Sequence, residues 1–146
     1  MFKSILVPTD GSELSDKALD RALVFAKEVN AKLCVCYVKP DEPLAYYGDG
    51  AFAATSNEQF TAAAEREAQR VLQRARDRAA SSGIAVDTTS PTSNWPHEAI
   101  IAAARERGCD LICMASHGRR GLRGLVLGSE TVKVLTHSDI PVFLYR

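Results

Sequence analysis

The sequence predicts an α/β fold in which a single doubly wound, five-stranded parallel sheet carries helices on both faces. Short apolar segments rich in β-forming residues alternate along the whole chain with longer segments of helical period. Segments such as "SILVP" and "DLICMA" are apolar on both strand faces, as in sheets covered on both sides. Strict alternation favours parallel strands joined by right-handed crossovers. A chain of 146 residues, 46% of them hydrophobic, suits one domain over residues 1–146.

The first two strands and the first helix are predicted near the N-terminus. "FKSILVP" is an apolar strand, and a helix from Glu13 to Asn30 follows, because Ala18, Ala22 and Ala26 recur on one helical face. "AKLCVCYV" is the second strand. The chain then enters a Pro-, Gly- and Asp-rich connection from Lys39 to Asn57, which is not regular structure throughout and is interpreted either as a lid or as a plain connection.

A long second helix and a weak third strand come next. The helix is predicted from Glu58 to Ser81, where apolar residues mark one face and charged residues the other. Its capping box is formed either by Ser56 with Gln59 or by Thr55 with Glu58. "IAVDTT" is the third strand, and its few apolar residues predict a position at a sheet edge.

The last third of the chain is predicted to hold two helices and two strands. Asn94 and Pro96 open a helix that runs to Arg107, with proline in the first turn, and Trp95 is interpreted as an apolar anchor at its entrance. "CDLICMA" is the fourth strand. A helix from Ser129 to His137 follows the glycine-rich stretch, and "IPVFLYR" is the fifth strand.

Charge and hydropathy exclude several classes of partner. Eighteen basic residues balance eighteen acidic ones, so the chain lacks the electrostatic footprint of a general nucleic-acid binder. No apolar run approaches the roughly 20 residues that span a bilayer, and the N-terminal apolar stretch is too short for a signal peptide. The four cysteines have neither zinc nor redox spacing and are interpreted as buried reduced thiols. We therefore expect a cytoplasmic protein with neither nucleic acid nor membrane as a partner.

The stretch "SHGRRGLRGLVLGSET" carries the richest chemistry. Gly128 and Ser129 stand at the head of the last helix, where unpaired N–H groups and the helix dipole attract phosphate. Glycine at position 128 would let the backbone come close to phosphate oxygens and adopt a positive φ, and Ser129 either caps the helix or binds the ligand. Arg119, Arg120 and Arg123 would add charge-assisted bonds. The alternative is a glycine-rich surface loop with a plain serine cap and solvated arginines.

Histidines and carboxylates do not predict a metal centre or a catalytic apparatus. His97 and His137 are interpreted as surface or capping residues, and His117 either contacts phosphate or organises the glycine-rich turn. The three histidines lack ligand spacing, so we predict no protein-held metal, and Mg²⁺ would reach the site only with a nucleotide. No evident nucleophile or carboxylate pair suggests acid–base catalysis, so we predict no catalytic residues.

The sequence resembles the universal stress protein family over its whole length. The residues that carry this resemblance are "ILVPTDGSELSDKAL", "MASHGRRGLRGLVLGSETVKVL" and the closing "IPVFLY". The family's nucleotide-binding members share the pattern G-x2-G-x9-G-[S/T], which falls here on Ala115, Gly118, Gly128 and Ser129. The resemblance implies a Rossmann-like sheet of order 3-2-1-4-5, an ATP pocket of the adenine nucleotide α-hydrolase type, and a homodimer formed through the C-terminal strand.

The resemblance also implies the residues of that pocket. Asp10 would contact the ribose or adenine side, Val38 would meet adenine, and the start of the last helix would hold the phosphates. For Val38 and Met114 the alternative is a core position, and for Asp10 it is a cap on the first helix. The binding residues carried over in this way are Pro8, Thr9, Asp10, Val38, Met114, Ala115, Gly118, Arg119, Arg120, Gly128, Ser129, Glu130 and Thr131.

Ala115 departs from the family pattern, which has glycine there. If the position needs φ > 0, the alanine costs on the order of 1 kcal/mol. If it abuts a phosphate or sugar, the methyl group obstructs the contact. The departure leaves two functions open: an ATP-binding protein, with or without Mg²⁺, that acts in stress response or signalling through conformation and association with slow or no hydrolysis, and a dimeric interaction module that binds no nucleotide. A nucleotide hydrolase or nucleotidyl-transfer enzyme on the same scaffold is a third reading.

Overall fold

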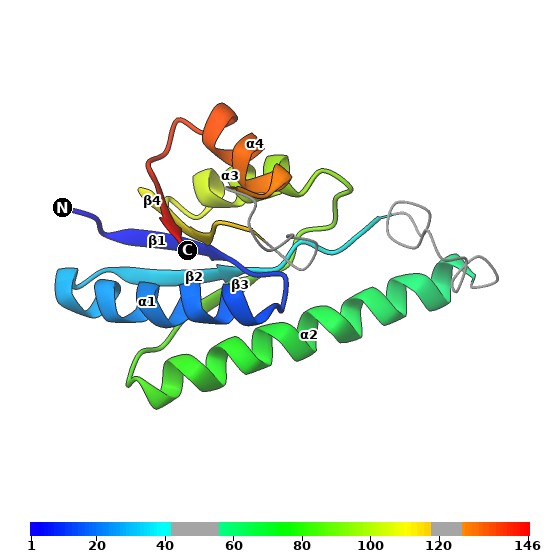
Figure 1. The fold of residues 1–146 in the computed structure, drawn as a ribbon. Coiled ribbons are helices and arrows are strands. Elements are labelled where there is room, and N and C mark those ends of the chain that lie inside the picture. The colour runs from blue at the N-terminus through cyan, green and yellow to red at the C-terminus, as the bar shows by residue number, and fades with distance from the viewer. Residues whose placement is uncertain (42–55, 118–126) are drawn as a thin grey trace.

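The computed structural model describes residues 1–41, 56–117 and 127–146 as three layers, with a sheet between two pairs of helices (Figure 1). The sheet has five parallel strands in the order β3-β2-β1-β4-β5, which confirms the predicted fold class and strand order. The strands are β1 Ser4–Pro8, β2 Lys32–Cys36, β3 Asp87–Thr89, β4 Leu111–Ala115 and β5 Val142–Tyr145.

Helices α1 and α2 lie on one face of the sheet and α3 and α4 on the other (Figure 1). Each face therefore has its own apolar core. Leu19, Leu23 and Val71 pack between the sheet and the first pair, whereas Ile100, Ile112 and Val134 pack on the opposite side. The helices are α1 Glu13–Val29, α2 Asn57–Ser81, α3 Pro96–Glu106 and α4 Ser129–His137.

The caps explain where the first two helices begin. Ser12 is the N-cap of α1, and its hydroxyl accepts a hydrogen bond from the Ser15 N–H at 3.2 Å. The alternative role of Asp10 as this cap is therefore wrong, because its carboxylate accepts from the Ser12 N–H instead, at 2.9 Å. For α2, Ser56 and Gln59 form the reciprocal capping box, the first of the two predicted pairs. Thr55 lies outside the described residues.

Two local predictions near β3 and α3 are corrected. The predicted strand began at Ile84, but the ladder of β3 covers only Asp87–Thr89. Ile84 and Val86 pack against the core and do not pair with β2. The predicted edge position of this strand is confirmed. Trp95 is 62% exposed at the N-cap of α3, so its interpretation as an apolar anchor is wrong.

The four cysteines are buried and reduced, as predicted. Burial raises the pKa of Cys36 to about 12 and that of Cys34 and Cys113 to about 11, and it also raises the pKa of Cys109. These thiols are protonated near neutral pH and act as small apolar side chains, because the thiolate is the reactive form.

The amino ends of β1 and β4 are tied together by Asp110. Its carboxylate accepts hydrogen bonds from the backbone N–H groups of Lys3 and Ser4, at 2.9 and 3.0 Å. Its own N–H donates to the Ser4 carbonyl at 2.8 Å. Burial acts to raise the pKa of Asp110, but the hydrogen bonds from Ser4 and Lys3 outweigh it and lower that pKa. The two strands are thus held together firmly where they begin.

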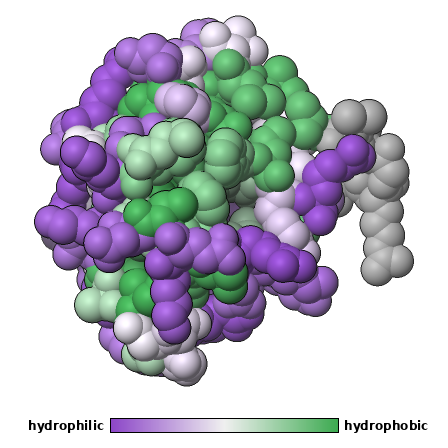
Figure 2. Space-filling view, turned by 90° about the vertical axis from the view of Figure 1, so that its left-hand side faces the viewer, coloured by the Kyte–Doolittle hydropathy of each residue, from purple (hydrophilic) through white to green (hydrophobic). Residues whose placement is uncertain are grey.

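Apolar side chains reach the surface around β5 and α4. Phe143 on β5 is 46% exposed, and Val132 and Leu135 on α4 are 46% and 40% exposed. Figure 2 views the molecule from the side where the chain begins and shows hydrophobic residues at the surface among hydrophilic ones. No helix within the described ranges is long and apolar enough to cross a bilayer.

Candidate functional site

The pairing of β1 with β4 stops before the carboxyl ends of the two strands, and this unpaired stretch is called the opening. Pairing between these two strands ends at Leu6 and Ile112. By contrast, the β1–β2 ladder continues to Pro8 and the β4–β5 ladder to Ala115. This opening lies at the point where the winding of the sheet reverses, which is where open α/β sheets bind ligands. The residues that follow β1 and β4 therefore form the candidate site.

Pro8, Thr9 and Asp10 lead the chain out of β1 on one side of the opening. Pro8 and Thr9 are buried, and Thr9 extends the β1–β2 pairing by donating its N–H to the Cys36 carbonyl at 2.9 Å. The Thr9 hydroxyl lies 3.0 Å from that of Ser15 and accepts from the Gly11 N–H at 3.1 Å. Asp10 is half-buried. Thr9 thus shapes the turn, and Asp10 is the most accessible to solvent of the three residues.

The start of α4 lies directly against the end of β4 on the other side. The Gly128 N–H donates to the Ser116 carbonyl at 2.7 Å. A Cβ atom at Gly128 would lie 3.1 Å from the His117 Cα, so glycine lets the start of α4 lie close to the end of β4. The predicted approach of this backbone to phosphate oxygens stays a prediction. The predicted positive φ is wrong, because Gly128 has φ −72° and ψ 156°. Glycine is needed here for space.

The amino end of α4 has no side-chain cap among the described residues. Gly128 is the N-cap, and Ser129 is the exposed first residue of the helix, so the alternative of Ser129 as the cap is wrong. The first intrahelical bond of α4 runs from the Val132 N–H to the Gly128 carbonyl at 3.0 Å. The preceding N–H groups point out of the helix start with the positive end of its dipole, an arrangement that suits an anion.

Thr131 and Glu130 fasten this helix end to its neighbours. The Thr131 hydroxyl, which is buried, donates to the Ala115 carbonyl at 3.2 Å and holds α4 against β4. The Glu130 carboxylate accepts from the His97 N–H at 3.0 Å and from the Lys133 Nζ at 3.1 Å, and the His97 Nδ1 lies 3.2 Å from it. The structure places Glu130 between α3 and α4, where it positions the helix start.

His97 has a structural role that the sequence did not predict. It is buried with 8% exposure and contacts Glu130, whereas the sequence interpretation made it a surface or capping residue. Its position directly after Pro96, in the first turn of α3, was visible in the sequence. Its partner Glu130 is 33 residues away in the sequence, so no local sequence pattern predicted the contact.

Val38 and Met114 both contribute to the core beneath α3 and α4. Met114 is 7% exposed, and Val38 is half-buried against the same cluster. Their placement agrees with the alternative interpretation of both as core residues. Gly118, Arg119, Arg120 and Arg123 lie outside the described residues.

Ala115 is free of backbone strain. Ala115 ends β4 in extended conformation. In the part of the chain that the structure describes, the only non-glycine residue with a positive φ is Asn30. The conformational cost considered for this departure from the family pattern is therefore absent. Ala115 is 7% exposed, and its carbonyl accepts a hydrogen bond from the Thr131 hydroxyl.

Glu130→Gln is expected to lower the free energy of unfolding near pH 7 and to have a smaller effect at acid pH. Burial acts to raise the pKa of Glu130, but hydrogen bonds from Lys133 and His97 outweigh it, so the pKa lies below the ordinary value. A lowered pKa contributes stability above the unfolded-state pKa, and that stability is lost as pH falls through the folded-state pKa. Because the side chain is 36% exposed, screening keeps the effect to at most about 1 kcal/mol.

Urea unfolding of both proteins between about pH 3 and pH 7 measures this effect. The unchanged protein should be the more stable at pH 7, and the difference should shrink toward acid. Parallel stability curves for the two proteins would contradict this role of Glu130.

Comparisons with known proteins place the whole chain in one family. A model of the universal stress protein family matches residues 1–146. The chain belongs to the universal stress protein family. It is 32% identical over 158 residues to universal stress protein YxiE of Bacillus subtilis, with 100% of each chain covered.

Solved structures resemble this universal stress protein in fold. The structure of MJ0577, a universal stress protein of Methanocaldococcus jannaschii, matches with a TM-score of 0.81 at 27% identity, covering 99% of this chain and 95% of that one. A universal stress protein in complex with cAMP matches with a TM-score of 0.72 at 26% identity, covering 99% and 97%. The second of these proteins binds an adenine nucleotide.

Proposed function

We propose that this universal stress protein binds ATP, alone or with Mg²⁺, and acts in stress response through nucleotide-dependent conformation and association. The observation that carries the proposal is the uncapped amino end of α4, which lies beside the opening between β1 and β4. The complex of a similar protein with cAMP supports an adenine nucleotide as the ligand. We place the protein in the cytoplasm and treat residues 1–146 as one functional domain.

The phosphates would lie at the start of α4, and the nucleoside in the opening. N–H groups of the first helical turn suit a phosphate by charge and direction, and Gly128 lets this helix start lie close to the end of β4. Arg119 and Arg120 would add charge, and Asp10 faces the site from the β1 side in this proposal. When Mg²⁺ accompanies the nucleotide, phosphate oxygens and water are the ligands that it prefers.

Fast turnover is not part of the proposal. The hydroxyls of Thr9 and Thr131 each take part in hydrogen bonds within the chain, so neither is prepared as a nucleophile. An activated nucleophile needs a base within hydrogen-bonding reach, and these hydroxyls contact a hydroxyl and a carbonyl instead. This arrangement argues against a covalent intermediate at either threonine, and slow or no hydrolysis by water is part of the proposal.

Calorimetric titration with Mg·ATP, and then with ADP and AMP, tests the proposal. We expect a saturable heat with ATP. The variant Ala115→Gly, which restores the family pattern, should bind at least as tightly, and any gain would come from space at the ligand because the backbone is unstrained. An absence of heat at millimolar ATP for both proteins would contradict nucleotide binding.

The second candidate function is a dimeric interaction module, and the edge strand β5 favours it. In the described part of the chain β5 pairs with β4 on one side, which leaves the other edge to a second strand. Phe143 on this strand is 46% exposed and adds apolar surface at that edge. We propose a homodimer through β5. Calorimetry with Mg·ATP separates the candidates, because an absence of heat together with a dimer seen by light scattering supports the module.

A further inference from the structure

Arg74 on α2 reaches the turn that carries Asp10 out of β1. Its Nη2 donates to the Gly11 carbonyl at 3.0 Å and also pairs with the Asp16 carboxylate on α1. Gly11 is 63 residues away in the sequence. The contact therefore joins the middle of the long helix to the β1 side of the candidate site.

The carbonyl that Arg74 binds belongs to the peptide group that also holds Asp10. The Gly11 carbonyl and the Ser12 N–H are the two ends of one peptide group, which is planar and rigid. The Ser12 N–H donates to Asp10 Oδ1 at 2.9 Å. A charged donor on the carbonyl polarises the peptide group, which strengthens the hydrogen bond that its N–H donates. Arg74 thus acts on the Asp10 carboxylate through a single peptide.

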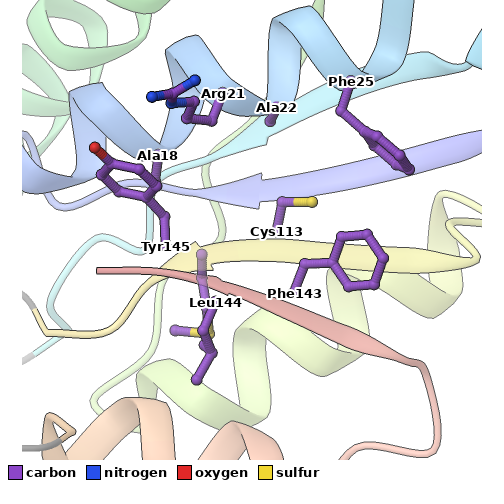
Figure 3. Close-up of a pocket in the computed structure, with 9 residues that line it drawn as sticks. Ala18, Arg21, Ala22, Phe25, Cys113, Phe143, Leu144 and Tyr145 are labelled. Atoms are coloured by element: carbon purple, nitrogen blue, oxygen red, sulfur yellow. The ribbon is translucent and has the colours of Figure 1, made fainter. Parts of the chain in front are cut away.

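Arg74 is also held by α1, which is packed on two of its faces. Ala18, Ala22 and Phe25 lie on the face of α1 toward β4 and β5 (Figure 3). On another face, Asp16 pairs with Arg74, and their side chains are 17% and 38% exposed. Pairs between fully exposed side chains contribute little, whereas Asp16 is mostly buried and fixes the direction of the guanidinium.

Arg78, one turn later on α2, makes the same kind of ion pair without reaching the turn after β1. Its Nη2 lies 2.8 Å from the Asp20 carboxylate and its Nη1 lies 3.9 Å from that of Asp16. Its side chain is 35% exposed, close to the 38% of Arg74. Within residues 1–41, 56–117 and 127–146, the hydrogen bonds of its side chain go to Asp20. Arg78 is therefore a matched control for Arg74.

We propose that Arg74 is a positioning residue that directs the Asp10 carboxylate toward the nucleoside part of the ligand. This role rests on the proposed nucleotide site. A carboxylate accepts hydrogen bonds, so Asp10 recognises a donor, which on a nucleoside is a hydroxyl or an amino group. Phosphates repel a carboxylate and lie at the start of α4 in the proposed function. Arg74 therefore strengthens binding of the nucleoside and leaves binding of the phosphates unchanged.

Calorimetric titration of Arg74→Gln with Mg·ATP and with magnesium tripolyphosphate separates the two parts of the ligand. We expect about tenfold weaker binding of ATP and unchanged binding of tripolyphosphate. Arg78→Gln should leave both affinities unchanged. Unchanged ATP affinity in Arg74→Gln would overturn the proposal. Equal losses for the two ligands would also overturn it, because a general disturbance of the site lowers both.

Amide hydrogen exchange at Ser12, followed by NMR in the free protein, tests the same link without a ligand. The Ser12 N–H should exchange up to about tenfold faster in Arg74→Gln and at an unchanged rate in Arg78→Gln. An unchanged rate in Arg74→Gln would overturn the positioning role. An absence of heat from ATP with the unchanged protein would contradict the proposed function, and faster exchange at Ser12 would then still support the link from Arg74 to Asp10.

Discussion

Gly128→Ala is expected to lower the affinity for Mg·ATP at least about tenfold. The added Cβ would lie 3.1 Å from the His117 Cα and 3.3 Å from the His117 Cβ, both anchored to the backbone. The start of α4 must therefore move away from the end of β4, which disturbs the 2.7 Å bond from the Gly128 N–H to the Ser116 carbonyl. Overpacking of this kind costs about 1–3 kcal/mol. Calorimetry with Mg·ATP and urea unfolding measure the two consequences.

Gly83→Ala is the matched control for this substitution. Gly83 has φ +74°, with nothing within 4 Å of an added Cβ, so alanine there strains the backbone without touching a neighbour. We expect a loss of about 1–2 kcal/mol in stability with unchanged nucleotide affinity. Normal affinity in Gly128→Ala would show that nucleotide binding does not depend on the close packing of the start of α4 against the end of β4.

Ile112→Ala should cause a large loss of stability. Ile112 is fully buried in the middle of β4, in the core shared with Val134 and Ile100 of the helices above. Removing its side chain forfeits apolar burial and leaves a cavity that the surrounding sheet closes only in part, at a cost of about 2–5 kcal/mol. Denaturant unfolding measures the change in midpoint and slope.

Val24→Ala serves as the comparison on α1. Val24 is 56% exposed, so its truncation should change stability by no more than about 0.5 kcal/mol. If Ile112→Ala cost as little as Val24→Ala, the two-core description of the sheet would be wrong.

The elements that the sequence predicted well are those with strong local signals. Alternation of apolar strands and periodic helices gave the fold class, and the Ser56 to Gln59 spacing gave the start of α2. Asp10 and Ser12 are both good caps, so residue type alone could not decide which one begins α1. The β3 boundary was missed because apolar character marks burial as well as pairing, and Ile84 and Val86 are packed without pairing.

The site was predicted less completely because it depends on contacts between distant segments. The pairing of Glu130 with His97 joins two helices, and neither residue type is unusual in its place. Gly128 was predicted as a site residue, but its φ depends on the approach of β4, which no spacing reveals. At Ala115 the family pattern has glycine, so the sequence left open whether the alanine strains the backbone. The backbone conformation shows that it does not.

The uneven contact between β1 and β4 has an energetic consequence for any ligand that enters there. Asp110 fastens the seam at its beginning, and the ladder ends two residues later along each strand. A molecule inserted beyond that point breaks no interstrand bond of the seam. The measured affinity would then carry no cost for broken interstrand bonds, although the ordinary costs of association remain.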